Sequence, residues 1–187
     1  MHAVIPNGVR DLLFVKSKAS TMAEKIVYIS LGSNLGDRAA MLERAVDALN
    51  SAGIRVARQS SLYITEPVGA PGQAWFLNAA AEAETSLLPV QLLHALLKIE
   101  RALGRRRITP HGPRTIDLDL LFYGSTVIRS RELEVPHPRL TERRFVLLPL
   151  AQIAPEFRHP TLHKSVTQLL AETPDRSEVR LWHEGKP

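Results

Sequence analysis

The sequence contains no cysteine, which excludes disulfide bonds, cysteine zinc sites, iron–sulfur clusters and thiol catalysis. It also lacks a run of about 18 uncharged apolar residues, so no segment is predicted to cross a membrane. Aromatic residues make up only 5% of the chain, which argues against a surface on which single-stranded nucleic acid would stack. No Gly-Lys-Ser/Thr phosphate-binding loop is present, so any nucleotide must be bound by another architecture.

The composition is that of a globular protein. Hydrophobic residues (44%) and charged residues (23%) are close to globular averages, and 187 residues fit one domain. The net charge of +5 includes a local cluster, in which Arg105, Arg106, Arg107 and Arg114 share a short stretch with proline and glycine. We therefore expect a positively charged loop there. The absence of cysteine fits a reducing compartment, and we expect a cytoplasmic protein.

Residues 1–24 differ from the rest of the chain because their hydrophobic residues show no periodicity. We interpret them as a flexible N-terminal extension, with Met22 as the natural start. Residues 25–187 are then a single domain.

Periodic patterns between residues 25 and 123 predict the order strand, helix, strand, strand, helix, strand. Strands are expected at 26–31, 54–65, 75–85 and 115–123, and helices at 37–52 and 89–103. The stretch 75–85 is alanine-rich, but its alternation of alanine with glutamate favours a strand. Asp37 and Pro89 are suited to the helix starts. This order is typical of an α+β, ferredoxin-like βαββαβ sandwich, an antiparallel sheet with both helices on one face. Helices near 143–153 and 166–172 would be C-terminal additions.

Two aspartates on the last predicted strand are the most informative feature. Because alternate residues of a strand share a face, Asp117 and Asp119 should point to the same side. Such close carboxylates repel each other unless a cation lies over them. They could pair with arginines on an ordinary sheet surface, or hold a divalent cation such as Mg²⁺. The apolar residues between and beside them are expected to face the helix-covered core: Ile116, Leu118, Leu120 and Phe122.

The arginine-rich loop comes directly before these aspartates. Arginine recognises phosphate oxygens through two parallel hydrogen bonds and keeps its charge at neutral pH. A cationic loop beside two carboxylates has the parts of a phosphoryl-transfer site. The Asp-x-Asp pattern alone is less specific, because glycosyltransferases also use it to hold a metal.

Residues 112–119, Gly-Pro-Arg-Thr-Ile-Asp-Leu-Asp, resemble the signature of the 6-hydroxymethyl-7,8-dihydropterin pyrophosphokinase family of folate biosynthesis. Residues 32–36, 76–78 and 135–139 are similar to further family motifs, in the expected order. The resemblance runs from about residue 26 to residue 155. It implies the ferredoxin-like fold and transfer of the pyrophosphoryl group of ATP to the hydroxyl of the pterin, with release of AMP.

The resemblance also implies roles for individual residues. Asp117 and Asp119 match the aspartates that hold two Mg²⁺ ions, and Arg105 and Arg114 match catalytic loop arginines. The matches to the nucleotide site are Glu100, Arg107, His137 and Arg143. The matches to the pterin pocket are Thr65, Pro67, Val68, Phe76, Asn78 and Phe145. His111 departs from the family, since many relatives have an aromatic residue there. The expected partners are ATP and a reduced pterin, with no nucleic acid or membrane, and we expect a monomer.

Two other classes remain as alternatives. Ferredoxin-like sheets with basic loops often bind RNA, but Asp117 and Asp119 on the exposed face would repel a phosphate backbone. A different metal-dependent transferase would share the aspartates without requiring a pocket around Phe76 and Asn78.

Overall fold

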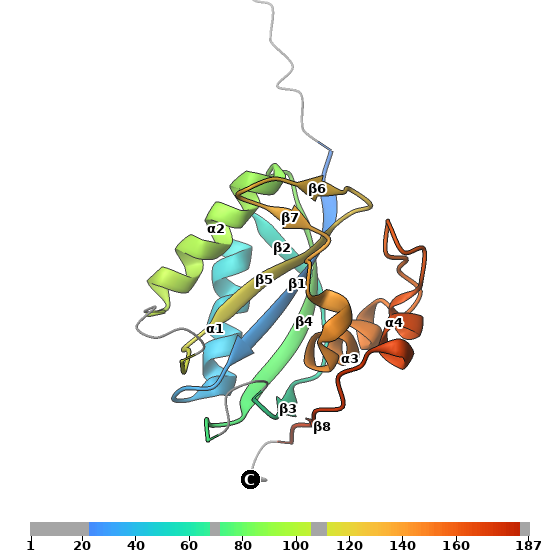
Figure 1. The fold of residues 1–187 in the computed structure, drawn as a ribbon. Helices are drawn as coiled ribbons and strands as arrows, with labels where there is room; N and C mark the ends of the chain where they lie inside the picture. The colour runs from blue at the N-terminus through green and yellow to red at the C-terminus, as the bar shows by residue number, and fades with distance from the viewer. Residues whose placement is uncertain (1–22, 68–71, 106–111, 184–187) are drawn as a thin grey trace, which may run out of the picture.

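The computed structural model describes residues 23–67, 72–105 and 112–183. Its centre is an antiparallel sheet in the order β5-β1-β4-β3-β8, with β2 also paired to β4 (Figure 1). The strands are β1 (Lys25–Ser33), β2 (Ile54–Gln59), β3 (Tyr63–Thr65), β4 (Phe76–Thr85), β5 (Asp117–Tyr123) and β8 (Val179–Leu181). β1 is central, since it pairs with both β4 and β5. The predicted extension, residues 1–24, lies almost entirely outside the described residues.

One face of the sheet is covered by α1 (Arg38–Ser51) and α2 (Pro89–Ala102) (Figure 1). Leu42 and Leu49 of α1 and Leu92 and Leu96 of α2 are fully buried against the sheet. The predicted starts are confirmed: the side chain of Asp37 accepts a hydrogen bond from the backbone of Ala40 at 3.1 Å, and proline opens α2. The α+β ferredoxin-like fold is therefore confirmed.

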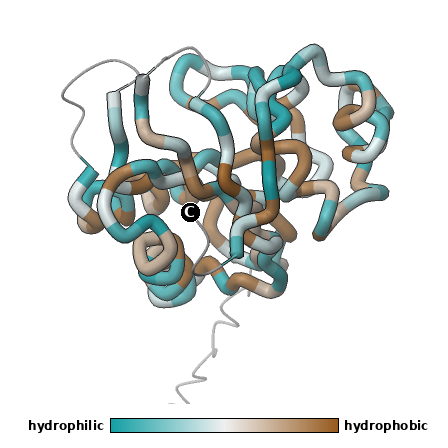
Figure 2. The backbone as a smooth tube through the Cα atoms, turned by 90° about the horizontal axis from the view of Figure 1, so that it is seen from below, coloured by the Kyte–Doolittle hydropathy of each residue, from teal (hydrophilic) through white to brown (hydrophobic). Residues whose placement is uncertain are grey.

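The opposite face is partly covered by α3 (Arg144–Ile153) and α4 (Val166–Glu172). Tyr28 and Phe122 of the sheet pack with Phe157 in a second hydrophobic cluster, with ring centroids 4.7–6.2 Å apart. Hydrophobic positions therefore lie on both sides of the sheet (Figure 2). The remaining elements are β6 (Ile128–Arg129), β7 (Glu134–Val135) and the short 3₁₀ helix η1 (Leu140–Glu142).

The sheet includes β8, which the sequence does not predict, and two of the predicted strands differ in detail. The single strand expected at 54–65 is two strands, because the Ser60 side chain accepts the backbone N–H of Ala80 and the ladder shifts there. Phe122 was expected to face α1 and α2, but it belongs to the cluster on the α3 side. The cause is a bulge: Leu120 lies opposite Ile29 and Phe122 opposite Tyr28, so one extra residue reverses the alternation.

Candidate active site

A pocket opens on the sheet face beside α3, where β1 ends and β5 begins. Its residues come from four strands, from the segments after β3 and before β5, from the segment that leads into α3 and from the first turn of α3. It is lined by Ser30, Gly32, Thr65, Glu66, Phe76, Asn78, Arg114, Asp117, Asp119, Arg139, Arg143 and Phe145. The fold thus brings together predicted metal, phosphate and pterin residues that are up to 80 positions apart in the chain.

The two aspartates lie on one face of β5, as predicted, because they pair in regular register with Gly32 and Ser30 of β1. Both carboxylates have arginine partners. Arg114 pairs with Asp117, and Arg105 Nη1 lies 2.7 Å from Asp117 Oδ1. Arg143 Nη1 lies 3.4 Å from Asp119 Oδ2. Arginine pairing, one of the two possibilities left open by the sequence, is therefore observed.

Burial and charge act together on these groups. Burial raises the pKa of Asp119 above its ordinary value, and the adjacent charge of Asp117 raises it further. Burial also lowers the pKa of His137, although the negative charge of Asp119 opposes the effect. A cation placed between the carboxylates would relieve the repulsion that raises the Asp119 pKa.

Glu100 connects α2 to this charged wall. Only 3% of the residue is exposed, and its Oε1 accepts the backbone N–H of Leu118 at 2.8 Å. It also pairs with Arg105, which therefore bridges Glu100 and Asp117. Burial, the largest cause, raises the pKa of Glu100 to about 7, against the lowering effects of the Leu118 N–H and of Arg105.

A second groove continues from the carboxylates between α2 and the segment around β7. It contains the predicted nucleotide-site residues Glu100, His137 and Arg143, with Leu97 on the α2 side. The bulge of β5 helps to place His137, because the carbonyl of Leu121 accepts its backbone N–H at 3.0 Å. The ring Nδ1 of His137 accepts the backbone N–H of Arg139 at 3.1 Å, which leaves Nε2 to carry the proton of the neutral ring.

The predicted pterin residues form the other end of the first pocket. Asn78 is buried and its Nδ2 donates to Thr65 Oγ1 at 2.7 Å. A Cβ added to Gly32 would lie 2.5 Å from Asn78 Oδ1, so the absence of a side chain there leaves room for the amide. Phe76 and Phe145 both line the pocket, and the Arg143 guanidinium lies 5.8 Å from the Phe145 ring centroid.

One predicted site residue that the structure describes lines neither the pocket nor the second groove, and others fall outside the described residues. Pro67 follows Glu66 in the chain but does not line the pocket. Val68 and Arg107 lie outside the described residues, as does His111.

Sequence reasoning missed several residues that build the site. Asn34 exchanges two hydrogen bonds with the backbone of Arg114, at 3.1 and 2.7 Å, and its Nδ2 lies 3.3 Å from the carbonyl oxygen of Ala74. It thereby joins the segment before β5 to the segment before β4. Asn34 and Arg139 belong to the family-like motifs at residues 32–36 and 135–139, but the sequence assigns neither a role, and nothing in the local pattern marks the pocket residue Glu66.

The carboxylates of the pocket suit a metal ion that is bound together with the phosphates of a substrate. Among the described residues, no group of three or more His, Asp or Glu side chains could hold a metal by itself. Mg²⁺, however, is commonly bound by one or two carboxylates together with substrate phosphates and water. Asp117 and Asp119 line the pocket and are the carboxylates that would serve this purpose. In the described part of the chain, no helix is both long enough and apolar enough to span a membrane.

Known proteins with similar sequences include pyrophosphokinases of the kind that the site residues indicate. The chain is 48% identical to the 2-amino-4-hydroxy-6-hydroxymethyldihydropteridine pyrophosphokinase of Bacillus subtilis (strain 168), over 84% of this chain and 90% of that protein. It is 42% identical to the folic acid synthesis protein fol1 of Pneumocystis carinii, over 87% of this chain but only 22% of that longer protein.

The fold is also found in solved structures. The crystal structure of Plasmodium falciparum HPPK-DHPS wild type with pteroate aligns with 80% of this chain and 42% of that chain. The TM-score is 0.64 at 17% sequence identity, which supports the fold alone. The family model of 7,8-dihydro-6-hydroxymethylpterin-pyrophosphokinase matches residues 28–155. Since this match covers more than half of the chain, the protein belongs to the 7,8-dihydro-6-hydroxymethylpterin-pyrophosphokinase family.

Proposed function

We propose that this chain transfers the pyrophosphoryl group of ATP to the hydroxymethyl group of 6-hydroxymethyl-7,8-dihydropterin, giving the diphosphate ester and AMP. One observation carries the proposal: a single pocket joins a wall of carboxylates and arginines to an end lined by two phenylalanines and a buried amide. The first part suits a metal-bound polyphosphate, and the second suits a flat, hydrogen-bonding ring.

The pterin ring would lie between Phe76 and Phe145, in the part of the pocket that also contains Asn78. Because Asn78 Nδ2 already donates to Thr65, its amide orientation is defined. The carbonyl oxygen and the second N–H of the amide are then available to the edge of a pterin. We retain Pro67 and Val68 as predicted members of this pocket.

Asp117 and Asp119 would hold Mg²⁺, and we propose two ions. Bound Mg²⁺ would neutralise charge on the polyphosphate and make the phosphorus easier to attack. Arg105 and Arg114 both pair with Asp117, so they could exchange this carboxylate for phosphate oxygens when ATP binds. They would then stabilise charge on the group being transferred. The rest of ATP would lie in the second groove with Glu100, His137 and Arg143, and we retain Arg107 as a predicted nucleotide contact.

The test is product analysis. Incubation of the protein with Mg·ATP and 6-hydroxymethyl-7,8-dihydropterin should release AMP in a one-to-one ratio with the pterin diphosphate. A matched reaction with 6-methyl-7,8-dihydropterin, which lacks the acceptor hydroxyl, should release none. ADP in place of AMP, or AMP without the hydroxylated pterin, would contradict the proposal. We also expect a monomeric, cytoplasmic enzyme, which sedimentation and cell fractionation would check.

A further inference from the structure

The C-terminal strand β8 lies beyond residues 28–155, yet it contacts both described ends of the β3–β4 connection, residues 66–75. We propose that β8 positions the pterin pocket, with Arg180 as a positioning residue that increases affinity for the pterin through Trp75. This inference deepens the proposed function and rests on it for the identity of the ligand.

The first contact is at the start of the connection. β8 pairs with β3, where Val179 lies opposite Thr65. The pairing continues past the strand, since the backbone N–H of Glu66 donates to the carbonyl of Glu178 at 3.1 Å. The backbone N–H of Glu178 lies 3.4 Å from Glu66 Oε2. Thr65 and Glu66 both line the pocket, so β8 holds one of its walls by backbone hydrogen bonds.

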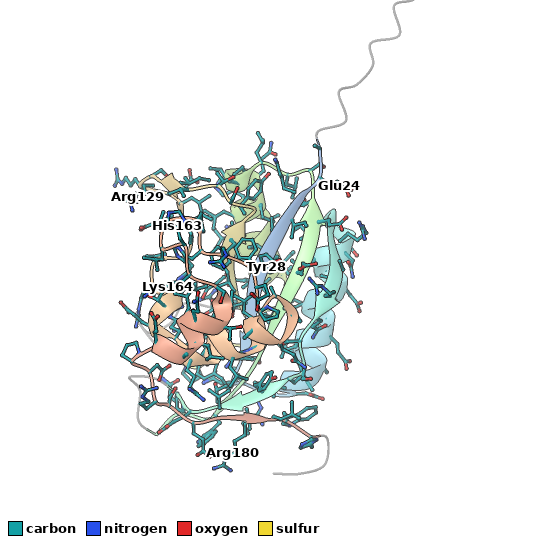
Figure 3. All side chains as sticks on the ribbon, turned by 90° about the vertical axis from the view of Figure 1, so that its right-hand side faces the viewer. Glu24, Tyr28, Arg129, His163, Lys164 and Arg180 are labelled. Atoms are coloured by element: carbon teal, nitrogen blue, oxygen red, sulfur yellow. The ribbon has the colours of Figure 1, made fainter. Side chains whose placement is uncertain are left out.

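The second contact is at the end of the connection. The guanidinium of Arg180 lies 5.5 Å from the centroid of the Trp75 ring, and Figure 3 shows Arg180 on β8 at the lower edge of the molecule. Trp75 directly precedes the pocket residue Phe76. The backbone of Trp75 is held separately, because its carbonyl accepts a hydrogen bond from Arg38 Nη1 at 2.6 Å. The ring contact with Arg180 therefore orients a residue whose main chain is already in place.

β8 can act in this way because its far end is attached to the core. The backbone N–H of Trp182 donates to the carbonyl of Leu62 at 2.8 Å, and the Trp182 side chain packs against the main hydrophobic cluster. Arg180 itself is exposed over 63% of its side chain and pairs with Glu178. Loss of such an exposed contact should alter ligand affinity without unfolding the domain, by about two- to fivefold in an equilibrium constant.

The test compares Arg180→Ala, Arg180→Lys, Trp75→Leu and the double variant Arg180→Ala/Trp75→Leu. Arg176→Ala is the matched control, since Arg176 is an exposed arginine four positions earlier in the same segment. The first readout is the dissociation constant of fluorescent 6-hydroxymethylpterin, and the second is the KM for ATP and kcat. The third is amide hydrogen exchange of residues 72–76.

We expect Arg180→Ala and Trp75→Leu each to weaken pterin binding about two- to fivefold. The double variant should bind the pterin no more weakly than whichever single variant has the lower affinity. Arg180→Lys should retain part of the wild-type affinity. The KM for ATP and kcat should be unchanged, and the control variant should behave like the wild type. Amide exchange at residues 72–76 should be faster only in the variants that lose the ring contact.

Wild-type pterin affinity and wild-type exchange in Arg180→Ala would overturn the inference, as would an equal rise in the KM for ATP. If the wild-type protein does not bind the pterin, the proposed function fails, whereas the exchange experiment still decides whether β8 orders this segment.

Discussion

At the scale of single residues, the pocket depends on the absence of a Cβ atom at Gly32. Gly32 lies within β1, and its lack of a side chain allows the close approach of the Asn78 amide. A glycine is needed where another group comes this near the main chain. The sequence could not reveal this, because Gly32 and Asn78 meet only through the pairing of β1 with β4.

Gly32→Ala should therefore weaken pterin binding by about tenfold or more, since the new Cβ displaces Asn78 from its hydrogen bond with Thr65. Titration with 6-hydroxymethylpterin would measure the change. Gly36→Ala is the control: Gly36 has a φ of +69° with no atom near its Cβ position, so that variant should lose some thermal stability and keep its affinity. Equal affinity in the two variants would contradict the role of Gly32.

Asp117→Asn and Asp119→Asn should each reduce kcat by about 10³-fold or more, because a lost metal ligand removes several kcal/mol of charge stabilisation. Neither side chain belongs to the hydrophobic core, so both variants should fold. Steady-state kinetics with Mg·ATP is the measurement, and Asp47→Asn on the exposed face of α1 is the control. Near-normal turnover in either variant would make the metal assignment wrong.

Arg105→Ala and Arg114→Ala should lower kcat and kcat/KM together, each by about 10²-fold, if these charges act mainly in the transition state. Lysine should restore little, since it cannot form two parallel hydrogen bonds. From the structure we also expect the two alanine variants to differ in thermal stability. Arg105→Ala leaves the buried Glu100 without its cation and should lower Tm, whereas Arg114 is more exposed and Arg114→Ala should not. A raised KM for ATP with unchanged kcat would show that these arginines contribute only to nucleotide binding.

At the scale of elements, periodicity predicted both covering helices and the succession of helices and strands along residues 25–123, because their apolar residues repeat along an uninterrupted segment. It failed where one strand contains an extra residue. An alternating pattern assigns Phe122 to the α1–α2 side, but the bulge in β5 moves it to the α3 side. Bulges depend on the partner strand and have no reliable local signal. This one has a structural consequence, because the carbonyl of Leu121 accepts the backbone N–H of His137.

The segment between α3 and α4 should make stability depend on pH. His159 is buried beside Phe122, and burial lowers its pKa. The folded state then favours the neutral ring, so the free energy of unfolding should fall as the pH decreases through the ordinary histidine pKa of about 6.5. His159→Asn keeps an acceptor near Nδ1, which accepts the backbone N–H of Leu162 at 3.3 Å, but cannot titrate. Thermal unfolding at about pH 7.5 and about pH 5.5 should show a smaller loss in the variant than in the wild type. Equal losses would exclude His159 as the cause.

At the scale of the whole molecule, the site is assembled from pieces that are distant in the chain. The chemistry of the aspartate pair and of the arginine loop predicted part of the pocket, and the resemblance to the family predicted most of the rest. It did not predict Asn34, Glu66 or β8 as parts of the site, since their contributions are hydrogen bonds between segments. Such contacts follow from the three-dimensional arrangement and leave no pattern within either segment.

In the described part of the chain, the carboxylates of the charged wall are balanced by arginine partners. The ion pairs join Arg105, Arg114 and Arg143 to Glu100, Asp117 and Asp119. Folding should therefore not require a metal to offset the aspartates, and EDTA should leave Tm unchanged while it abolishes turnover. Melting curves and AMP assays on the same samples would test this, and a fall of several degrees in Tm would show that the metal is structural.

This balance has a consequence for a cell. Because arginines of the chain pair with the site carboxylates, we expect the protein to fold whatever the supply of magnesium. Shortage of the proposed ion should then stop catalysis without unfolding the enzyme, and activity should return without new synthesis when the ion is restored.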